Sequence, residues 1–193
     1  MNEYKVPEGK VLGLRTCQAD MSSSHDFVWP KEGYVEAPDW DPIEECGNGL
    51  HALLRGLGDP SLLDWAEDAV WLAVEIDEAL VVDLEGKVKF PHGQVILVGD
   101  RSTVCTFIKA AYPDLAVIGA MATAGDAGTA TAGDWGTATA GDEGAILIRR
   151  WNGKRYRYEM ANIGENGIEA NKPYQLDREG RFVLAEEESD ANH

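Results

Sequence analysis

The sequence predicts an α+β protein that is mainly β, in which an N-terminal α+β part is followed by a short parallel β-solenoid of octapeptide repeats and a capping β-hairpin. Three observations predict this class: β-type apolar runs between residues 70 and 99, an eight-residue motif that recurs between 125 and 148, and an Asn-Gly turn signal at 152–153. We expect an acidic α+β domain at 1–98, the repeat at 99–148 with an insertion at 107–118, closing strands at 149–185 and a disordered acidic tail at 186–193.

The N-terminal part is expected to open with a short strand or hairpin at residues 4–16. Residues 27–45 contain three prolines and are expected to be irregular, exposed and acidic. A helix of about ten residues is expected from Asp59 to Val70, because Asp59 is a suitable N-cap and Pro60 suits a first helical turn. Strands are then expected at 70–76, 79–84 and 94–99.

The repeat reads GDAGTATA at 125–132, GDWGTATA at 133–140 and GDEGAILI at 141–148. In each octad Gly-Asp-x-Gly predicts a tight turn whose glycines take positive φ. The next four residues are predicted to be extended, with Ala facing a thin interior and Thr the surface. Units this short bury little alone, so they are expected to stack in parallel. A disordered Gly/Ala/Thr linker is the alternative, and the branched apolar residues of AILI argue against it.

The closing part is expected to be a hairpin that turns at Asn152-Gly153 and caps the solenoid. A second turn-strand pair, residues 167–177 and 180–185, completes the ordered chain. The acidic residues after it are typical of a disordered tail.

Composition bounds the class of protein. The chain has 193 residues, 44% of them hydrophobic, which fits one sizeable core. No stretch approaches the roughly 20 apolar residues of a membrane span, and the start lacks the apolar block of a signal peptide. The three cysteines, Cys17, Cys46 and Cys105, are too few and too scattered for a disulfide framework. Free, mostly buried thiols and a cytoplasmic location are therefore expected.

The net charge of −17 is uneven along the chain. Residues 1–100 hold 20 acidic and 7 basic side chains, and residues 101–193 hold 14 and 10. Such a field repels nucleic acid and anionic membranes, so direct nucleic-acid or membrane binding is not expected. The acidity either keeps the protein soluble or competes for a basic groove on another protein, and charge alone does not separate the two readings.

The repeat, the ending GENGIEANKPYQLDREGRFV and the early CGNGLHALLRG together resemble a family of small uncharacterised phage and prophage proteins. Cys46, Gly49, Leu50, His51 and Ala52 match the Cys-x-x-Gly-Leu-His-Ala signature of that family. GDRSTVCT at 99–106 looks like a further octad, set off by an insertion. The resemblance implies a phage or prophage origin and a location in the host cytoplasm, without implying an activity.

A fainter similarity is to the ADP-ribosyltransferase-like fold. It is carried by Arg15 in an early strand, the cluster Ser22, Ser23 and Ser24, and a late strand HGQVILVG. In that family a Glu of the late strand positions the ribose and the acceptor. This chain has Gln94, Val95 and Ile96 in the corresponding stretch, so the resemblance implies an inactive relative or, as the alternative, an enzyme.

Other chemistry has little support in the sequence. Cys46 and His51 lack the paired spacing of a structural zinc site, so no metal is expected and His51 is expected to fix a turn by bonding backbone. No nucleophile sits in a recognisable catalytic motif, and no phosphate-binding glycine loop is present. No catalytic residue and no cofactor is expected. Thr-Ala-Thr at 129–131 and 137–139 would line Thr pairs on one flat face for ice binding, but two triplets are few for an array.

The function that we expect from these observations is non-catalytic binding, as an acidic inhibitor that mimics nucleic acid on a basic surface of a host protein or a nucleoprotein defence complex. A structural or oligomerisation protein built on the solenoid is a further alternative. The residues expected at the surface that binds the partner are aromatic anchors and acids of the proline-rich segment. They are Trp29, Glu32, Tyr34, Glu36, Asp39, Trp40, Asp41, Glu44 and Glu45.

A second, basic patch is expected on the closing hairpin. Five basic residues alternate there with aromatic residues and could meet acidic groups of a second subunit, giving a homodimer through this patch or through the solenoid end. The other reading, slightly favoured, is a sheet face that neutralises acids within the chain. The residues are Arg149, Arg150, Lys154, Arg155 and Arg157.

Overall fold

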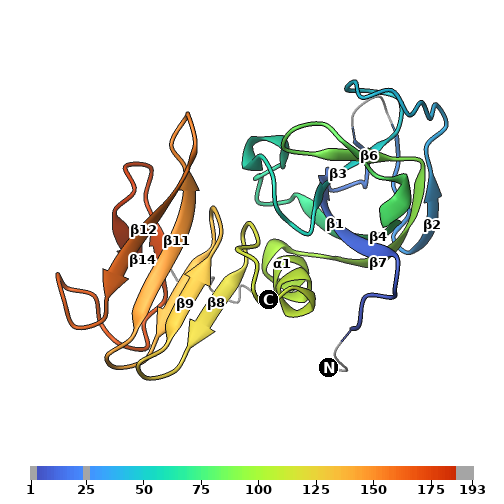
Figure 1. The fold of residues 1–193 in the computed structure, drawn as a ribbon. Helices are drawn as coiled ribbons and strands as arrows, with labels where there is room; N and C mark the ends of the chain where they lie inside the picture. Colours follow the sequence, from blue (N-terminus) through green and yellow to red (C-terminus); the bar gives the residue numbers. More distant parts are fainter. Residues whose placement is uncertain (1–3, 24–26, 186–193) are drawn as a thin grey trace. The chain divides into compact units, whose positions relative to one another are not determined.

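The computed structural model describes residues 4–23 and 27–185, so Ser24 of the serine cluster and the tail at 186–193 lie outside the described residues. The chain forms two compact units, unit 1 (Met1–Ile118) and unit 2 (Gly119–His193). It is α+β and mainly β, as the sequence predicts. Figure 1 shows strands throughout both units and the helix α1 in unit 1.

Unit 1 is built on an antiparallel sheet in the order β2-β7-β4-β1-β3-β6-β5. The longest ladder joins β1 to β4 over eight residue pairs. Apolar side chains of the strands and of the segment before β2, among them Val11, Trp29, Val74 and Phe90, form a buried core. The strands are β1 (Lys10–Cys17), β2 (Gly33–Glu36), β3 (Leu50–Leu54), β4 (Val70–Asp77), β5 (Val82–Asp83), β6 (Val88–Phe90) and β7 (His92–Gly99).

Helix α1 (Arg101–Ala111) packs against β1, β4 and β7 through Val104, Cys105 and Ile108. The expectation of a further octad at 99–106 is wrong, because Gly99 ends β7 and residues 101–106 form the first part of α1. The Asp100 carboxylate accepts a hydrogen bond from the Thr103 amide at 2.7 Å and caps the helix. This stretch also has Ser102 where the true octads have their second glycine, and the turn of the repeat needs that glycine.

The helix expected from Asp59 to Val70 is also wrong, because only a 3-10 turn forms at Pro60–Leu62. Asp59 does cap it, accepting from the Ser61 amide at 2.9 Å. The next amides are bound elsewhere: that of Asp64 donates to Thr16 Oγ1 at 2.7 Å, and that of Ala66 to the Asp64 carboxylate at 3.0 Å. These bonds compete with helix formation.

The strands expected at 70–76 and 94–99 are confirmed as β4 and β7. The single strand expected at 79–84 does not form: residues 79 and 80 end a 3-10 turn (Glu78–Leu80), and only the two-residue β5 follows. The segment 27–45 is less irregular and less exposed than expected, because it contains β2 and buries Trp29, Val35 and Ala37.

Unit 2 contains two small sheets, in the orders β14-β13-β10-β8 and β12-β11-β9. Their inner residues, mostly Ala and Ile, form one core with Ile168 and Tyr174. The expected hairpin β11–β12 and the closing pair β13–β14 are confirmed. The strands are β8 (Met121–Ala124), β9 (Thr129–Ala132), β10 (Thr137–Ala140), β11 (Ala145–Trp151), β12 (Tyr156–Asn162), β13 (Tyr174–Leu176) and β14 (Phe182–Leu184).

Candidate functional site

Strands of the repeat pair with strands that lie two octads earlier in the sequence. β10 runs parallel to β8 with Thr137 opposite Met121, and β11 runs parallel to β9 with Ala145 opposite Thr129, so each strand pairs with the strand sixteen residues earlier. Successive octads therefore lie in different sheets, and two octads together make one turn of the chain. The two Thr-Ala-Thr triplets accordingly lie in different sheets, which corrects the expectation that they share one flat face.

Side chains along these strands alternate as the sequence predicts. Ala130, Ala132, Ala138 and Ala140 are each at most 2% exposed, which is possible only because methyl groups fill the thin space between the two sheets. The threonines between them face outward and are exposed or half-buried. The outer positions of β11 depart from this pattern, since Ala145 and Leu147 stand where an octad of the TATA type has Thr.

The turns differ from the expectation that their glycines take positive φ. Positive φ occurs at the variable residue, at Ala127 (54°), Trp135 (58°) and Glu143 (58°). Three of the glycines are required instead by close approach of the neighbouring turn: the second glycines Gly136 and Gly144, and the first glycine Gly141, whose Cβ would lie 2.7 Å from the Asp126 amide nitrogen. A Cβ at Gly136 would lie 2.6 Å from the carbonyl oxygen of Ala120, and one at Gly144 would lie 2.7 Å from that of Gly128.

The aspartates of the motif connect successive turns of the chain. Asp126 Oδ1 accepts a hydrogen bond from the Asp142 amide at 3.1 Å, sixteen residues on. Asp134 is 3% exposed, and its two carboxylate oxygens accept from the Trp151 amide at 3.0 and 3.1 Å. These carboxylates therefore hold backbone amides that would otherwise lack an acceptor, and their role is structural.

The outward threonines form two short arrays. In the β10–β8 sheet, Thr137 and Thr139 lie beside Met121 and Thr123 in register. In the β11–β9 sheet, Thr129 and Thr131 lie beside Ala145 and Leu147. Neighbouring strands are about 4.8 Å apart, and alternate residues along a parallel strand about 6.6 Å apart, so these outward positions are regularly spaced. Hydroxyls occupy three of them across two strands of the first sheet and two of them along one strand of the second.

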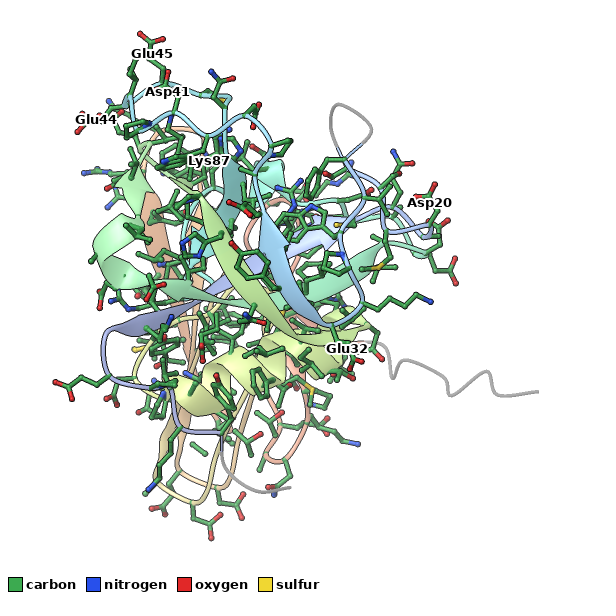
Figure 2. The ribbon with its side chains drawn as sticks, turned by 90° about the vertical axis from the view of Figure 1, so that its right-hand side faces the viewer. Asp20, Glu32, Asp41, Glu44, Glu45 and Lys87 are labelled. Carbon is green, nitrogen blue, oxygen red and sulfur yellow. The ribbon has the colours of Figure 1, made fainter. Side chains whose placement is uncertain are left out.

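The residues expected to form an acidic and aromatic binding surface do not lie together. Trp29 is 2% exposed and belongs to the core of unit 1, so it is not a surface anchor. Trp40 is half-buried against that core, and Tyr34 is 55% exposed on β2. Figure 2 shows Asp41, Glu44 and Glu45 together at one end of unit 1 and Glu32 well away from them. Glu36 and Asp39 are exposed.

The basic patch lies on the β11–β12 hairpin, where part of its charge is matched within the hairpin. Arg150 Nε contacts the Glu159 carboxylate at 3.1 Å, and the Arg149 guanidinium lies 4.4 Å from the centre of the Tyr156 ring. Lys154, Arg155 and Arg157 are exposed. The Arg150–Glu159 pair therefore agrees with the hypothesis that acids within the chain neutralise this sheet face. The acid, however, lies on β12 and not in the N-terminal part.

No cluster of His, Cys, Asp or Glu suited to a metal ion occurs within residues 4–23 and 27–185. Cys17 and Cys105 are buried free thiols, and Cys46 is an exposed one. In the described part of the chain no helix is both long and apolar enough to cross a membrane.

A protein family described as "Domain of unknown function (DUF7666)" matches residues 11–110. Bacterial ice nucleation proteins are similar over part of the chain: InaU of Pantoea ananas is 38% identical over 105 residues, and a Pseudomonas syringae protein 39% identical over 109 residues. A third relative, from Xanthomonas campestris pv. translucens, is 40% identical over 106 residues. No solved structure matches the chain significantly.

These matches cover 53%, 55% and 54% of this chain but only 10%, 10% and 7% of the three relatives. Each matched stretch is longer than unit 2, residues 119–193, so it includes residues of unit 1 as well. The likeness to ice nucleation proteins is therefore wider than the repeat alone.

The comparisons correct four expectations. The resemblance to a phage family and the fainter one to ADP-ribosyltransferases are wrong, since the similar proteins are bacterial and named for ice nucleation. The function as an inhibitor of a host defence complex is wrong with them, and so is the expected location in the host cytoplasm.

Proposed function

The chain belongs to the family described as a domain of unknown function (DUF7666), and we propose that its unit 2 is a short β-solenoid whose outward threonines order water at the onset of freezing. The observation that carries this proposal is the sixteen-residue parallel register, which places Thr side chains of the repeat at regular positions outside a core of Ala. The similar bacterial proteins are named for ice nucleation, and we take the class of ligand, ice, from them.

Contacts between successive turns of the chain support the proposed solenoid. Backbone amides of one turn donate to carbonyls of the previous one, as from Thr137 to Ala120 at 3.1 Å and from Ala145 to Gly128 at 2.9 Å. The motif glycines allow this close approach, and the motif carboxylates bind amides of the following turn. Each added pair of octads therefore repeats the same contacts, as in other stacked-repeat folds.

A threonine array suits water because each side chain offers a hydroxyl and a methyl group. The hydroxyl can donate one hydrogen bond and accept two, so it fixes water molecules in position. The β-branched side chain is stiff at χ1, which keeps the hydroxyls at the spacing that the backbone sets. Waters held on such an array lose little further entropy when they join a crystal.

The small size of the array limits what one chain can do. Only Thr123, Thr137 and Thr139 lie on one sheet and Thr129 and Thr131 on the other. A patch this small templates few waters, so we expect the single chain to nucleate ice weakly and longer arrays to nucleate it at higher temperature. The relatives' much greater length fits this dependence on size.

Droplet-freezing temperature of the purified full chain tests the proposal. The length variant carries one or more extra copies of residues 125–140, each adding one turn of the solenoid. The surface variant changes the five outward threonines to Val, which keeps the branched shape and removes the hydroxyl. A matched control changes the same five to Ser, which keeps the hydroxyl.

We expect freezing temperature to rise with each added turn and to fall back toward the buffer value in the Val variant, with the Ser control in between. Circular dichroism checks that the variants remain folded. The proposal is overturned if the lengthened chain freezes at the temperature of buffer alone, or if the folded Val variant freezes like the unchanged lengthened chain.

A further inference from the structure

A pocket lies in unit 1 where β1 and β3 separate. β1 pairs with β4 along its whole length but with β3 only at Gly13 and Leu14. Around the point of separation lies a pocket of about 1240 Å³, lined on the β1 side by residues 14–18 and on the β3 side by residues 46–53. A space of this size suits a small organic molecule better than a single ion.

Arg15 reaches into this opening with hydrogen-bonding capacity left unused. Its Nη1 donates to the His51 carbonyl at 2.8 Å, and its guanidinium lies 5.0 Å from the centre of the Trp29 ring. Arg15 Nε is buried and has no acceptor among residues 4–23 and 27–185, and the same part of the chain offers no partner to the buried His51 Nε2. Buried polar groups of this kind are normally satisfied, so a ligand atom is the expected partner.

The pocket is locally positive although the chain carries a net charge of −17. Burial and the charges of Lys87, Arg15 and Lys89, in that order, lower the pKa of His51 to about 4. Burial raises the pKa of the neighbouring Cys17 thiol, so this thiol stays neutral and does not balance the charge of Arg15.

The two carboxylates that line the pocket do not balance the charge of Arg15 through any described contact. Asp64 Oδ1 accepts from the Ala66 amide at 3.0 Å in its own turn. Asp39 is exposed at the rim. Two lysines lie near His51. Lys89 donates to the carbonyls of Glu45 at 2.9 Å and of Gly47 at 3.5 Å. Lys87 donates to Cys46 Sγ at 2.9 Å, and no carboxylate of residues 4–23 and 27–185 forms an ion pair with it. Arg15 and Lys87 are therefore the cations available to a ligand.

We propose that this pocket binds a small organic anion whose carboxylate or phosphate group pairs with the Arg15 guanidinium, while Lys87 attracts it to the opening. A guanidinium fork matches the geometry of either oxyanion, and the partly dry setting strengthens the attraction. Phe27, Leu50, Ala52 and Leu62 give the rest of the ligand an apolar wall. The site lies within unit 1 and is independent of ice binding by unit 2.

Isothermal titration calorimetry on the full chain tests this site with two probes, pyrophosphate for the phosphate arm and citrate for the carboxylate arm, at constant ionic strength set with NaCl. The test variant is Arg15→Gln. The matched control is Arg178→Gln, which removes the same charge from an exposed arginine of unit 2. Lys87→Gln is a second test variant, for the case in which circular dichroism shows that Arg15→Gln does not fold.

We expect saturable binding of at least one probe, weakened about tenfold or more by Arg15→Gln, weakened less by Lys87→Gln and unchanged by Arg178→Gln. The probe that binds more tightly identifies the oxyanion. Absence of saturable binding of both probes overturns the proposal. Equal affinity of the unchanged chain and a folded Arg15→Gln variant, or of Lys87→Gln where Arg15→Gln does not fold, overturns it as well.

Discussion

His51 shows how a residue's surroundings decide its charge. It lies on β3 beside the pocket, and burial, followed by the charges of Lys87, Arg15 and Lys89, lowers its pKa from 6.5 to about 4. A backbone hydrogen bond at Gly49 opposes this shift only in part. In the folded chain the imidazole is therefore neutral at neutral pH. The three cations around His51 could not be foreseen from the sequence, because Arg15 lies on β1 and the two lysines lie on β6 or directly before it.

The lowered pKa makes stability depend on pH in a window set by this residue. As pH falls below about 6.5, His51 takes up a proton in the unfolded chain but stays neutral in the folded chain, so the free energy of unfolding decreases. The decrease ends near pH 4, below which His51 is protonated in both states. His51→Gln should remove this part of the loss. Urea unfolding at several pH values between 7.5 and 4 measures it as the difference between variant and wild type.

A second variant sharpens the test of His51. Lys87→Gln removes the largest charge contribution, so the folded-state pKa should rise and the loss of stability should become smaller while His51 is retained. Identical pH profiles for wild type, His51→Gln and Lys87→Gln would show that His51 does not control stability in this range.

At the scale of the elements, the period of the repeat and the inward orientation of its Ala side chains could be predicted from the sequence, because both are local patterns. The sixteen-residue register of strand pairing could not. Each octad has the same turn signal, and only contacts such as Gly136 against the carbonyl of Ala120 decide which octads become neighbours. The helix expected after Asp59 fails to form for a similar reason: the Asp64 amide donates a hydrogen bond to Thr16, 48 residues away in the sequence. The candidate site was missed for the same reason, because the faces on which threonines gather depend on that register.

Gly136, the second glycine of its octad, should tolerate substitution far less than Gly125, a first glycine that no neighbouring atom approaches. Gly136→Ala places a Cβ 2.6 Å from a backbone oxygen and should cost about 1–3 kcal/mol in free energy of unfolding. Gly125→Ala has nothing within 4 Å of its Cβ and no positive φ, so it should be neutral or stabilise by up to about 1 kcal/mol. Urea denaturation followed by far-UV circular dichroism compares them, and equal effects would contradict the close-approach account.

At the scale of the whole molecule, the excess of acid is the dominant charge term. The described ion pairs, such as Lys10–Asp77 at 2.7 Å and Arg150–Glu159 at 3.1 Å, are partly exposed, and pairs of this kind contribute about 0–1 kcal/mol each. A net charge of −17 instead repels itself across the folded chain. Salt screens both kinds of interaction. Weaker attraction within the ion pairs lowers the stability of the fold, whereas weaker repulsion among the acids raises it.

Added NaCl should therefore stabilise the protein, because screening relieves more repulsion than attraction. We expect the midpoint of thermal unfolding to rise between 10 and 150 mM salt, by about 2–4 °C for each kcal/mol of repulsion removed. The double variant Glu44→Gln/Glu45→Gln removes two exposed acids that lie together, so it should melt higher at low salt and respond less to NaCl. A midpoint that falls with salt would mean that the ion pairs outweigh the repulsion, and that the acidity of this chain does not limit its stability.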